Sequence, residues 1–280
     1  WRPSGSMTYG RWYPSLVTLP GGNLFVASGV TKLMKPIYRD KPADESGDNV
    51  RQTETYDLDA GTWSDNGPTA ERSLPLFPRL HLLPNGKVYY GAAGQSFNPM
   101  GQSYNEALWN IAATYDPASK SWTDLGVPGI GTTVEPGFRG STFQQMLPLK
   151  APYDKASFLS AGGVLGMSPG SWIPTRSTRI DQVTINGDGT ESLESFAAGP
   201  LNRPRWYSSA VTLPTGQVFA FSGADIDEVV TPGSESPIRQ VEMFTPNPEG
   251  TGGTWTDVAV ASRKRTYHNS ATLLPDGSIL

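Results

Sequence analysis

The chain has 280 residues, 37% of them hydrophobic and 17% charged, which is enough for one large all-β domain or two ordinary ones. A net charge of −4 argues against a nucleic-acid partner, and no apolar run approaches the roughly 18 residues of a membrane span. Because the chain has no cysteine, these residues form neither disulfides nor thiolate metal sites.

The two ends of the chain indicate a longer protein. The chain opens on Trp1 rather than on an initiator Met, and it stops at Leu280, partway through a predicted strand whose earlier copies continue to a glycine. We therefore expect residues 1–280 to be an internal segment with further residues on both sides. No signal peptide is visible in these residues.

A Leu-Pro-x-Gly turn recurs along the chain. It occupies residues 19–22, 83–86, 213–216 and 274–277, and a degenerate copy without the glycine lies at 146–149. The turn prolines are 64, 64, 66 and 61 residues apart. This even spacing predicts a long structural repeat.

Each repeat contains the same predicted elements in the same order. An entry strand such as 15–19 leads into the turn, and a mostly apolar second strand follows at 24–27, 87–90, 157–160 and 218–221. The second strand ends in a pair of small residues that includes a glycine. A long loop comes next, then a third strand that carries Tyr56 or Tyr115, and a fourth that opens with Trp63, Trp122 or Trp255.

Four strands per repeat, an apolar inner strand and a glycine pair are typical of a kelch-type β-propeller blade, so the predicted fold class is all-β. We predict one propeller domain over 1–280, with blades that begin near 11, 75, 138, 204 and 265, the last of them incomplete. The Tyr and Trp positions are interpreted as packing between blades. One helical turn is expected within 105–112.

The extra length of each repeat lies in the loops 30–52, 95–111, 164–177 and 224–239. Loops longer than about 12 to 15 residues are usually functional, and these four leave the predicted blades from one face. Their acidic residues also leave open a glycoside hydrolase, although such clusters are usually only solvated. Those residues are Asp40, Asp44, Glu45, Asp48, Asp225, Asp227 and Glu228.

Aromatic residues and a histidine occupy one repeated position, seven residues before the turn proline. They are Tyr13, Phe77, Tyr207 and His268, and Tyr267 stands one residue before the last of them. Because blades radiate from a common axis, equivalent positions converge, so Tyr13 and His268 are expected to meet. Phenolate and imidazole suit a redox-active transition metal.

A purely structural role for these residues is the alternative to a metal site. Aromatic residues at strand entries are usually packing residues, and His81, in the middle of a predicted strand, is interpreted as structural. In a regular strand adjacent side chains point to opposite faces, so Tyr267 and His268 bind one metal only where the strand is irregular.

The motifs Gly10-Arg11-Trp12-Tyr13-Pro14-Ser15 and Arg265-Thr266-Tyr267-His268-Asn269-Ser270 resemble those of the galactose oxidase and glyoxal oxidase group of copper radical oxidases. The resemblance implies a seven-bladed propeller with one copper ion. It implies Tyr13 as the radical tyrosine, cross-linked to a cysteine, Tyr267 as the axial ligand and general base, and His268 as a further ligand. For the stacking tryptophan we predict Trp172, with Trp12 as the alternative.

The same resemblance implies oxidation of a primary alcohol, a small aldehyde or a glycan end by O2, with H2O2 as product, in a secreted extracellular or cell-surface protein. The sequence does not define the oligomeric state, and a monomer is expected. The cysteine partner and a second histidine ligand are expected outside residues 1–280. The alternative is a non-catalytic kelch propeller that binds a protein or glycan partner through its long loops.

Overall fold

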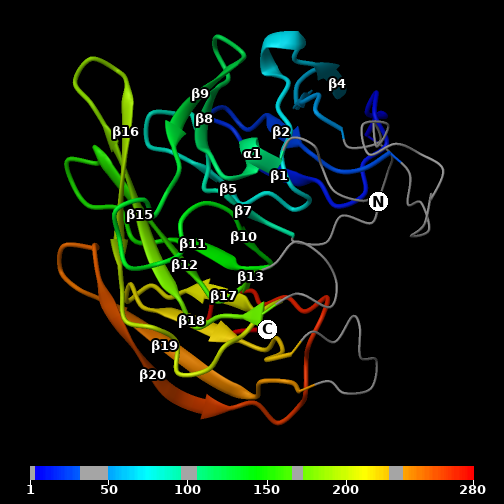
Figure 1. Cartoon of the computed structure of the whole chain (residues 1–280). Coiled ribbons are helices and arrows are strands. Elements are labelled where there is room, and N and C mark those ends of the chain that lie inside the picture. Colours follow the sequence, from blue (N-terminus) through cyan, green and yellow to red (C-terminus); the bar gives the residue numbers. More distant parts are fainter. Residues whose placement is uncertain (1–3, 32–49, 96–105, 166–172, 227–235) are drawn as a thin grey trace. The chain divides into compact units, whose positions relative to one another are not determined.

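The structure is a computed structural model that describes residues 4–31, 50–95, 106–165, 173–226 and 236–280 (Figure 1). The chain forms two compact units, Trp1–Gly126 and Val127–Leu280. Each unit is built almost entirely of antiparallel strands, so the predicted all-β class is confirmed.

Unit 1 contains two four-stranded antiparallel sheets. Repeat 1 consists of β1 (Ser15–Thr18), β2 (Leu24–Ala27), β3 (Glu54–Asp57) and β4 (Thr62–Asp65), paired in that order. Repeat 2 consists of β5 (Leu80–Leu82), β6 (Val88–Tyr90), β8 (Ala112–Asp116) and β9 (Ser121–Gly126). The short helix α1 (Glu106–Trp109) confirms the predicted helical turn. The unit also holds the 3-10 turn η2 (Pro68–Ala70) and the two-residue strand β7 (Ala93–Gly94).

Unit 2 repeats this arrangement. Repeat 3 consists of β11 (Phe143–Met146), β12 (Lys155–Ala161), β15 (Thr178–Ile185) and β16 (Glu191–Ala197). Repeat 4 consists of β17 (Ser209–Thr212), β18 (Val218–Phe221), β19 (Gln240–Pro246) and β20 (Gly253–Val260). Three short strands pair beside them: β10 (Arg139–Gly140), β13 (Val164–Leu165) and β14 (Ile173–Pro174).

The Leu-Pro-x-Gly turns join the first and second strands as predicted. In repeats 2 and 4 the N–H groups of Gly86 and Gly216 each donate to the leucine carbonyl three residues earlier, at 2.9 Å. Both glycines have positive φ, 85° and 91°, a conformation that residues with a Cβ adopt only with strain. Repeat 3 lacks this glycine, and a longer connection, 147–154, takes the place of the tight turn.

Aromatic side chains pack neighbouring repeats together, which confirms the predicted role for Tyr115 and Trp255, whereas Tyr56 and Trp63 contact each other within repeat 1. In unit 1 the ring of Phe25 in repeat 1 stacks on Tyr115 in repeat 2, with 4.5 Å between centroids. In unit 2 Trp255 of repeat 4 lies beside Phe143 of repeat 3, and its Nε1 donates to Thr178 Oγ1 at 3.0 Å.

Replacing Trp255 by phenylalanine is expected to lower the free energy of unfolding by about 1 kcal/mol, because the buried hydrogen bond to Thr178 is lost while most of the apolar contact remains. Urea unfolding of the full-length protein measures this change. Trp63→Phe in β4, where the ring is only half-buried, is the control and should stay within about 0.5 kcal/mol of wild type. Equal losses in both variants would contradict the packing role of Trp255.

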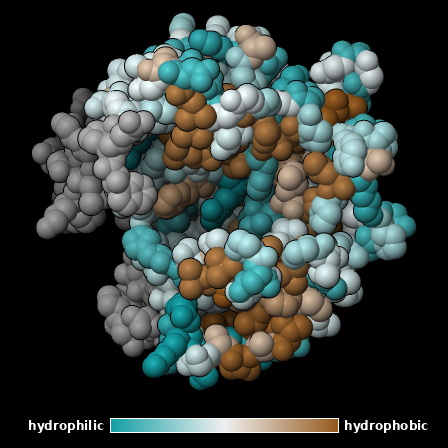
Figure 2. All heavy atoms as spheres, turned by 180° about the vertical axis from the view of Figure 1, so that it is seen from behind, coloured by the Kyte–Doolittle hydropathy of each residue, from teal (hydrophilic) through white to brown (hydrophobic). Residues whose placement is uncertain are grey.

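Several large apolar side chains are exposed, among them Ile130, Ile173 and Val260. Figure 2 shows hydrophobic residues reaching the surface next to hydrophilic ones on the face that it draws. Single exposed apolar residues are ordinary in folded proteins. None of the helices in the described part of the chain has the length and apolar character to cross a bilayer.

Candidate metal centre

One backbone conformation recurs at the start of every repeat. The residue seven positions before the turn proline has a left-handed φ in all five copies: Tyr13 (64°), Phe77 (45°), Ser141 (53°), Tyr207 (55°) and His268 (57°). Ser141 was missed by the sequence analysis, because its repeat has neither the aromatic residue nor the turn glycine. Its spacing to Pro148 is the signal that identifies it.

The bend follows a backbone bridge to the loop after the second strand. In repeat 1 Trp12 and Val30 exchange two hydrogen bonds, of 2.9 and 3.0 Å, and Trp206 and Ala224 form the same bridge in repeat 4. The glycine before the bridge partner is needed for this approach. A Cβ on Gly223 would lie 2.3 Å from the carbonyl oxygen of Trp206. The glycine pair and the bend therefore form one local structure.

The bend at His268 brings the two candidate ligands to the same side of the chain. The rings of Tyr267 and His268 are stacked, with 3.6 Å between centroids and 27° between planes. A positive φ interrupts the alternation of a regular strand, so the irregularity that a shared metal requires is present. Trp12 and Tyr13 repeat this arrangement with 3.6 Å between centroids and 11° between planes.

Residues at equivalent positions contact one another within each unit, as the propeller interpretation predicted. In unit 1 the rings of Tyr13 and Phe77 stack at 4.3 Å, and Phe77 N–H donates to the Tyr13 carbonyl at 2.9 Å. In unit 2 the Tyr207 N–H donates to the carbonyl of Ser141 at 3.1 Å, and the ring of Tyr207 lies 4.6 Å from that of Tyr267, one residue before the equivalent position. The expected meeting of Tyr13 with His268 joins the two units and stays a prediction.

The segment around Tyr267 and His268 is open to solvent, and the side-chain amide of Asn269 helps to anchor it to repeat 4. Tyr267 is 40% exposed, and residues 264–270 line an open pocket of about 480 Å³. The Asn269 Nδ2 group donates to the carbonyls of Thr266 and Tyr207, and Ser209 Oγ donates to Asn269 Oδ1 at 2.7 Å. The backbone on both sides of the ring pair is therefore tied to repeat 4.

Comparisons with known proteins agree with the motifs. No family model matches the chain. The aldehyde oxidase GLOX of Vitis pseudoreticulata is 24% identical over 274 residues, which cover 97% of this chain and 45% of the relative. A solved fungal alcohol oxidase of the AA5 family, in complex with copper, matches with a TM-score of 0.65 at 21% identity over 98% of this chain.

These similarities support the resemblance to the copper radical oxidases that the motifs indicate. The chain spans about half the length of the relatives that it matches, 45% of the plant protein and 48% of the fungal structure.

The donor set around Tyr267 suits the copper ion of a copper radical oxidase. Among the described residues, no group of three or more His, Asp or Glu side chains is placed to hold a metal. A phenol beside an imidazole offers instead the oxygen and nitrogen donors that copper accepts. Tyr267 and His268 therefore fit copper better than they fit magnesium or calcium.

Of the two tryptophans predicted to stack on Tyr13, the structure describes only Trp12. Trp172 lies outside the described residues, as do most of the loop acids that left a glycoside hydrolase open. Trp12, the alternative, stacks on Tyr13. His81 lies within β5, as expected for a structural residue.

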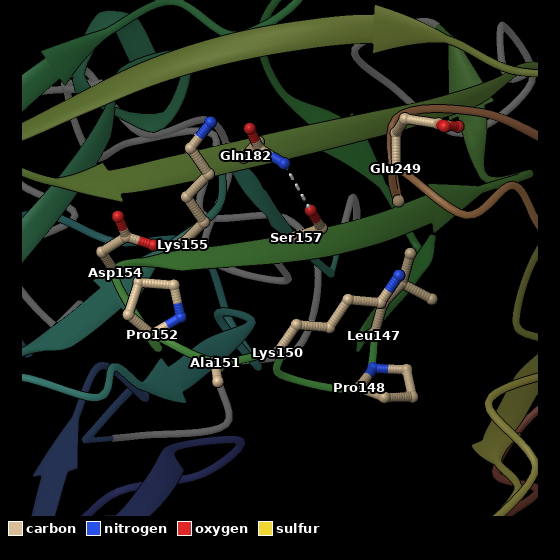
Figure 3. A pocket seen from close by; sticks show the side chains of 11 residues that line it. Leu147, Pro148, Lys150, Ala151, Pro152, Asp154, Lys155, Ser157, Gln182 and Glu249 are labelled. Carbon is tan, nitrogen blue, oxygen red and sulfur yellow. Dashed lines mark hydrogen bonds between the residues drawn. The ribbon is translucent and has the colours of Figure 1, made fainter.

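Unit 2 also has a cavity at the other end of its strands. It measures about 310 Å³, and the side chains of Lys150, Lys155 and Gln182 are among those that line it (Figure 3). Gln182 Nε2 donates to Ser157 Oγ at 3.0 Å there. β12 runs from Lys155 at this cavity to Ala161 near the bend of repeat 3, so the cavity is separated from the bends by the length of a strand.

Proposed function

We propose that the chain forms the central part of a copper-dependent radical oxidase that oxidises a primary alcohol, a small aldehyde or the end of a glycan with O2. The observation that carries the proposal is the stacked Tyr267–His268 pair, presented on one side of a left-handed bend. The likeness to an aldehyde oxidase and to a copper-bound alcohol oxidase supports it.

The proposal includes the domain that carries the site. Residues 1–280 would be part of one seven-bladed kelch propeller, with blades that begin near 11, 75, 138, 204 and 265. The four-stranded sheets and the 0.65 TM-score support this architecture. The protein would be secreted, as the family resemblance implies, and we expect it to act as a monomer.

Tyr13, Tyr267 and His268 would hold the copper, and a second histidine and the cysteine partner of Tyr13 would come from outside these residues. Bound copper would supply one of two one-electron acceptors, and O2 would take up both electrons and both protons as H2O2. Tyr267 Oη would accept, as general base, the hydroxyl proton of the alcohol or of the hydrated aldehyde. The Tyr13 radical would take a hydrogen atom from the substrate carbon, while the Trp12 ring covers one face of Tyr13.

Metal analysis and electron paramagnetic resonance of the copper-loaded full-length protein test this proposal. We expect one copper per chain and a copper(II) signal that disappears on oxidation, when a coupled tyrosyl radical forms. Copper that persists in a Tyr13→Phe/His268→Ala variant, or no stoichiometric copper in the wild type, would overturn the proposal. The chain would then be a binding propeller that acts through its long loops.

A further inference from the structure

An arginine stands two residues before the left-handed bend in repeats 1 and 4, and each is buried with a glutamate from the third strand. Arg11 Nη2 lies 2.8 Å from Glu54 Oε2, and Arg205 Nη2 pairs with Glu242 Oε1. All four side chains are 0% exposed. Burial lowers the pKa of Arg205, while the charge of Glu242 acts in the opposite direction.

The two pairs make the same contacts. Arg11 donates to the carbonyls of Ser28 at 2.9 Å and Gln52 at 3.0 Å, and Glu54 accepts the N–H of Thr8 at 2.6 Å. Each pair therefore ties together three stretches: the segment before the bend, the end of the second strand and the start of the third.

In repeat 4 the partners occupy equivalent places. Arg205 donates to Ser222 and Gln240, and Glu242 accepts the N–H of Asn202 at 2.6 Å. Ser28 and Ser222 themselves have left-handed φ values of 65° and 59°. The arginine thus holds both sides of the strand junction at which the bend forms.

Stability alone does not explain a fully buried ion pair, because desolvation offsets much of the attraction between the charges. The planar guanidinium group directs its donors in fixed directions, so it specifies geometry as well as contributing energy. Recurrence of one hydrogen-bond set at two bends of the same shape indicates that the pair orients the bend.

We propose that Arg11 and Glu54 are positioning residues, which set the bend at Tyr13 and thereby aim its ring at the metal. This inference rests on the proposed function. The corresponding pair in repeat 4 lies beside the proposed ligands, because the Tyr207 carbonyl accepts from Asn269 and the Tyr207 ring contacts Tyr267. The matched control is therefore the buried pair Arg179–Asp181 in β15, whose other hydrogen bonds go to Glu135, Gly137 and Ser195 rather than to a proposed ligand.

Glu54→Gln and Asp181→Asn in the full-length protein are the matched test. Copper titration should show about 10- to 100-fold weaker binding for Glu54→Gln, the range typical of residues that orient a metal ligand. Its copper(II) resonance spectrum and its near-ultraviolet circular dichroism without copper should also change, since the Trp12–Tyr13 stack moves. Asp181→Asn should bind copper within about twofold of wild type.

Should Glu54→Gln not fold, Arg11→Met/Glu54→Gln and Arg179→Met/Asp181→Asn make the same comparison without leaving a buried charge unpaired. Equal copper affinities in the two matched variants overturn the positioning role while the proposed function stands. A wild-type protein that binds no copper overturns both.

Discussion

Replacing His268 by alanine in the full-length protein is expected to weaken copper binding by more than about 100-fold, the upper limit for loss of a residue that only supports a ligand. The imidazole supplies the nitrogen donor beside Tyr267, and its ring lies on the same side of the bend. Alanine removes that donor while the hydrogen bonds from the Asn269 side-chain amide to the carbonyls of Tyr207 and Thr266 remain. Copper titration followed by metal analysis of the isolated protein measures the change.

The second histidine of the chain provides the control. His81→Gln lies in β5 of repeat 2 and should keep the copper affinity of the wild type, whatever its effect on stability. A His268→Ala protein that folds and binds copper as tightly as His81→Gln would exclude His268 as a ligand.

Replacing Gly223 by alanine is expected to lower the free energy of unfolding by about 3 kcal/mol, the sum of a strained left-handed residue and an overpacked contact. The φ of Gly223 is +85°, and an added Cβ would lie 2.3 Å from Trp206 O and 2.8 Å from Ser208 Oγ. The backbone bridge between Trp206 and Ala224 then has to open. Chemical unfolding of the full-length protein measures the loss.

Gly189→Ala separates the two contributions. Gly189 has nearly the same φ, +83°, but nothing lies within 4 Å of an added Cβ. Only the conformational strain remains, so the expected loss is about 1 kcal/mol. Similar losses at both positions would mean that the close approach of Gly223 to Trp206 contributes nothing.

The repeated elements were predictable because their signals are local. The Leu-Pro-x-Gly turn needs a glycine at a position of positive φ, and the second strand of each repeat is an apolar run next to it. Repeat 3 shows the limit of this approach. It has Ser141 where other repeats have an aromatic residue or histidine, so only its distance from Pro148 identifies it.

The backbone conformation of the site and its buried ion pairs could not be predicted from the sequence. Residues with a Cβ rarely adopt positive φ. The local sequence therefore gives no reason to expect the left-handed conformation of Tyr13 and His268. The glutamates that pair with Arg11 and Arg205 lie 43 and 37 residues further along the chain, beyond loops of unequal length. Their pairing follows from the order of the strands, which a linear pattern does not show.

The five left-handed bends have a consequence for how new activities arise on this scaffold. Serine, phenylalanine, tyrosine and histidine occupy them with φ values between 45° and 64°. In repeats 1 to 4 the backbone is therefore prepared by the glycine after the second strand and by the bridge, whatever side chain the bend carries. Reactivity is thus separated from folding, and a lineage can exchange the group displayed at one bend without redesigning the sheet that displays it.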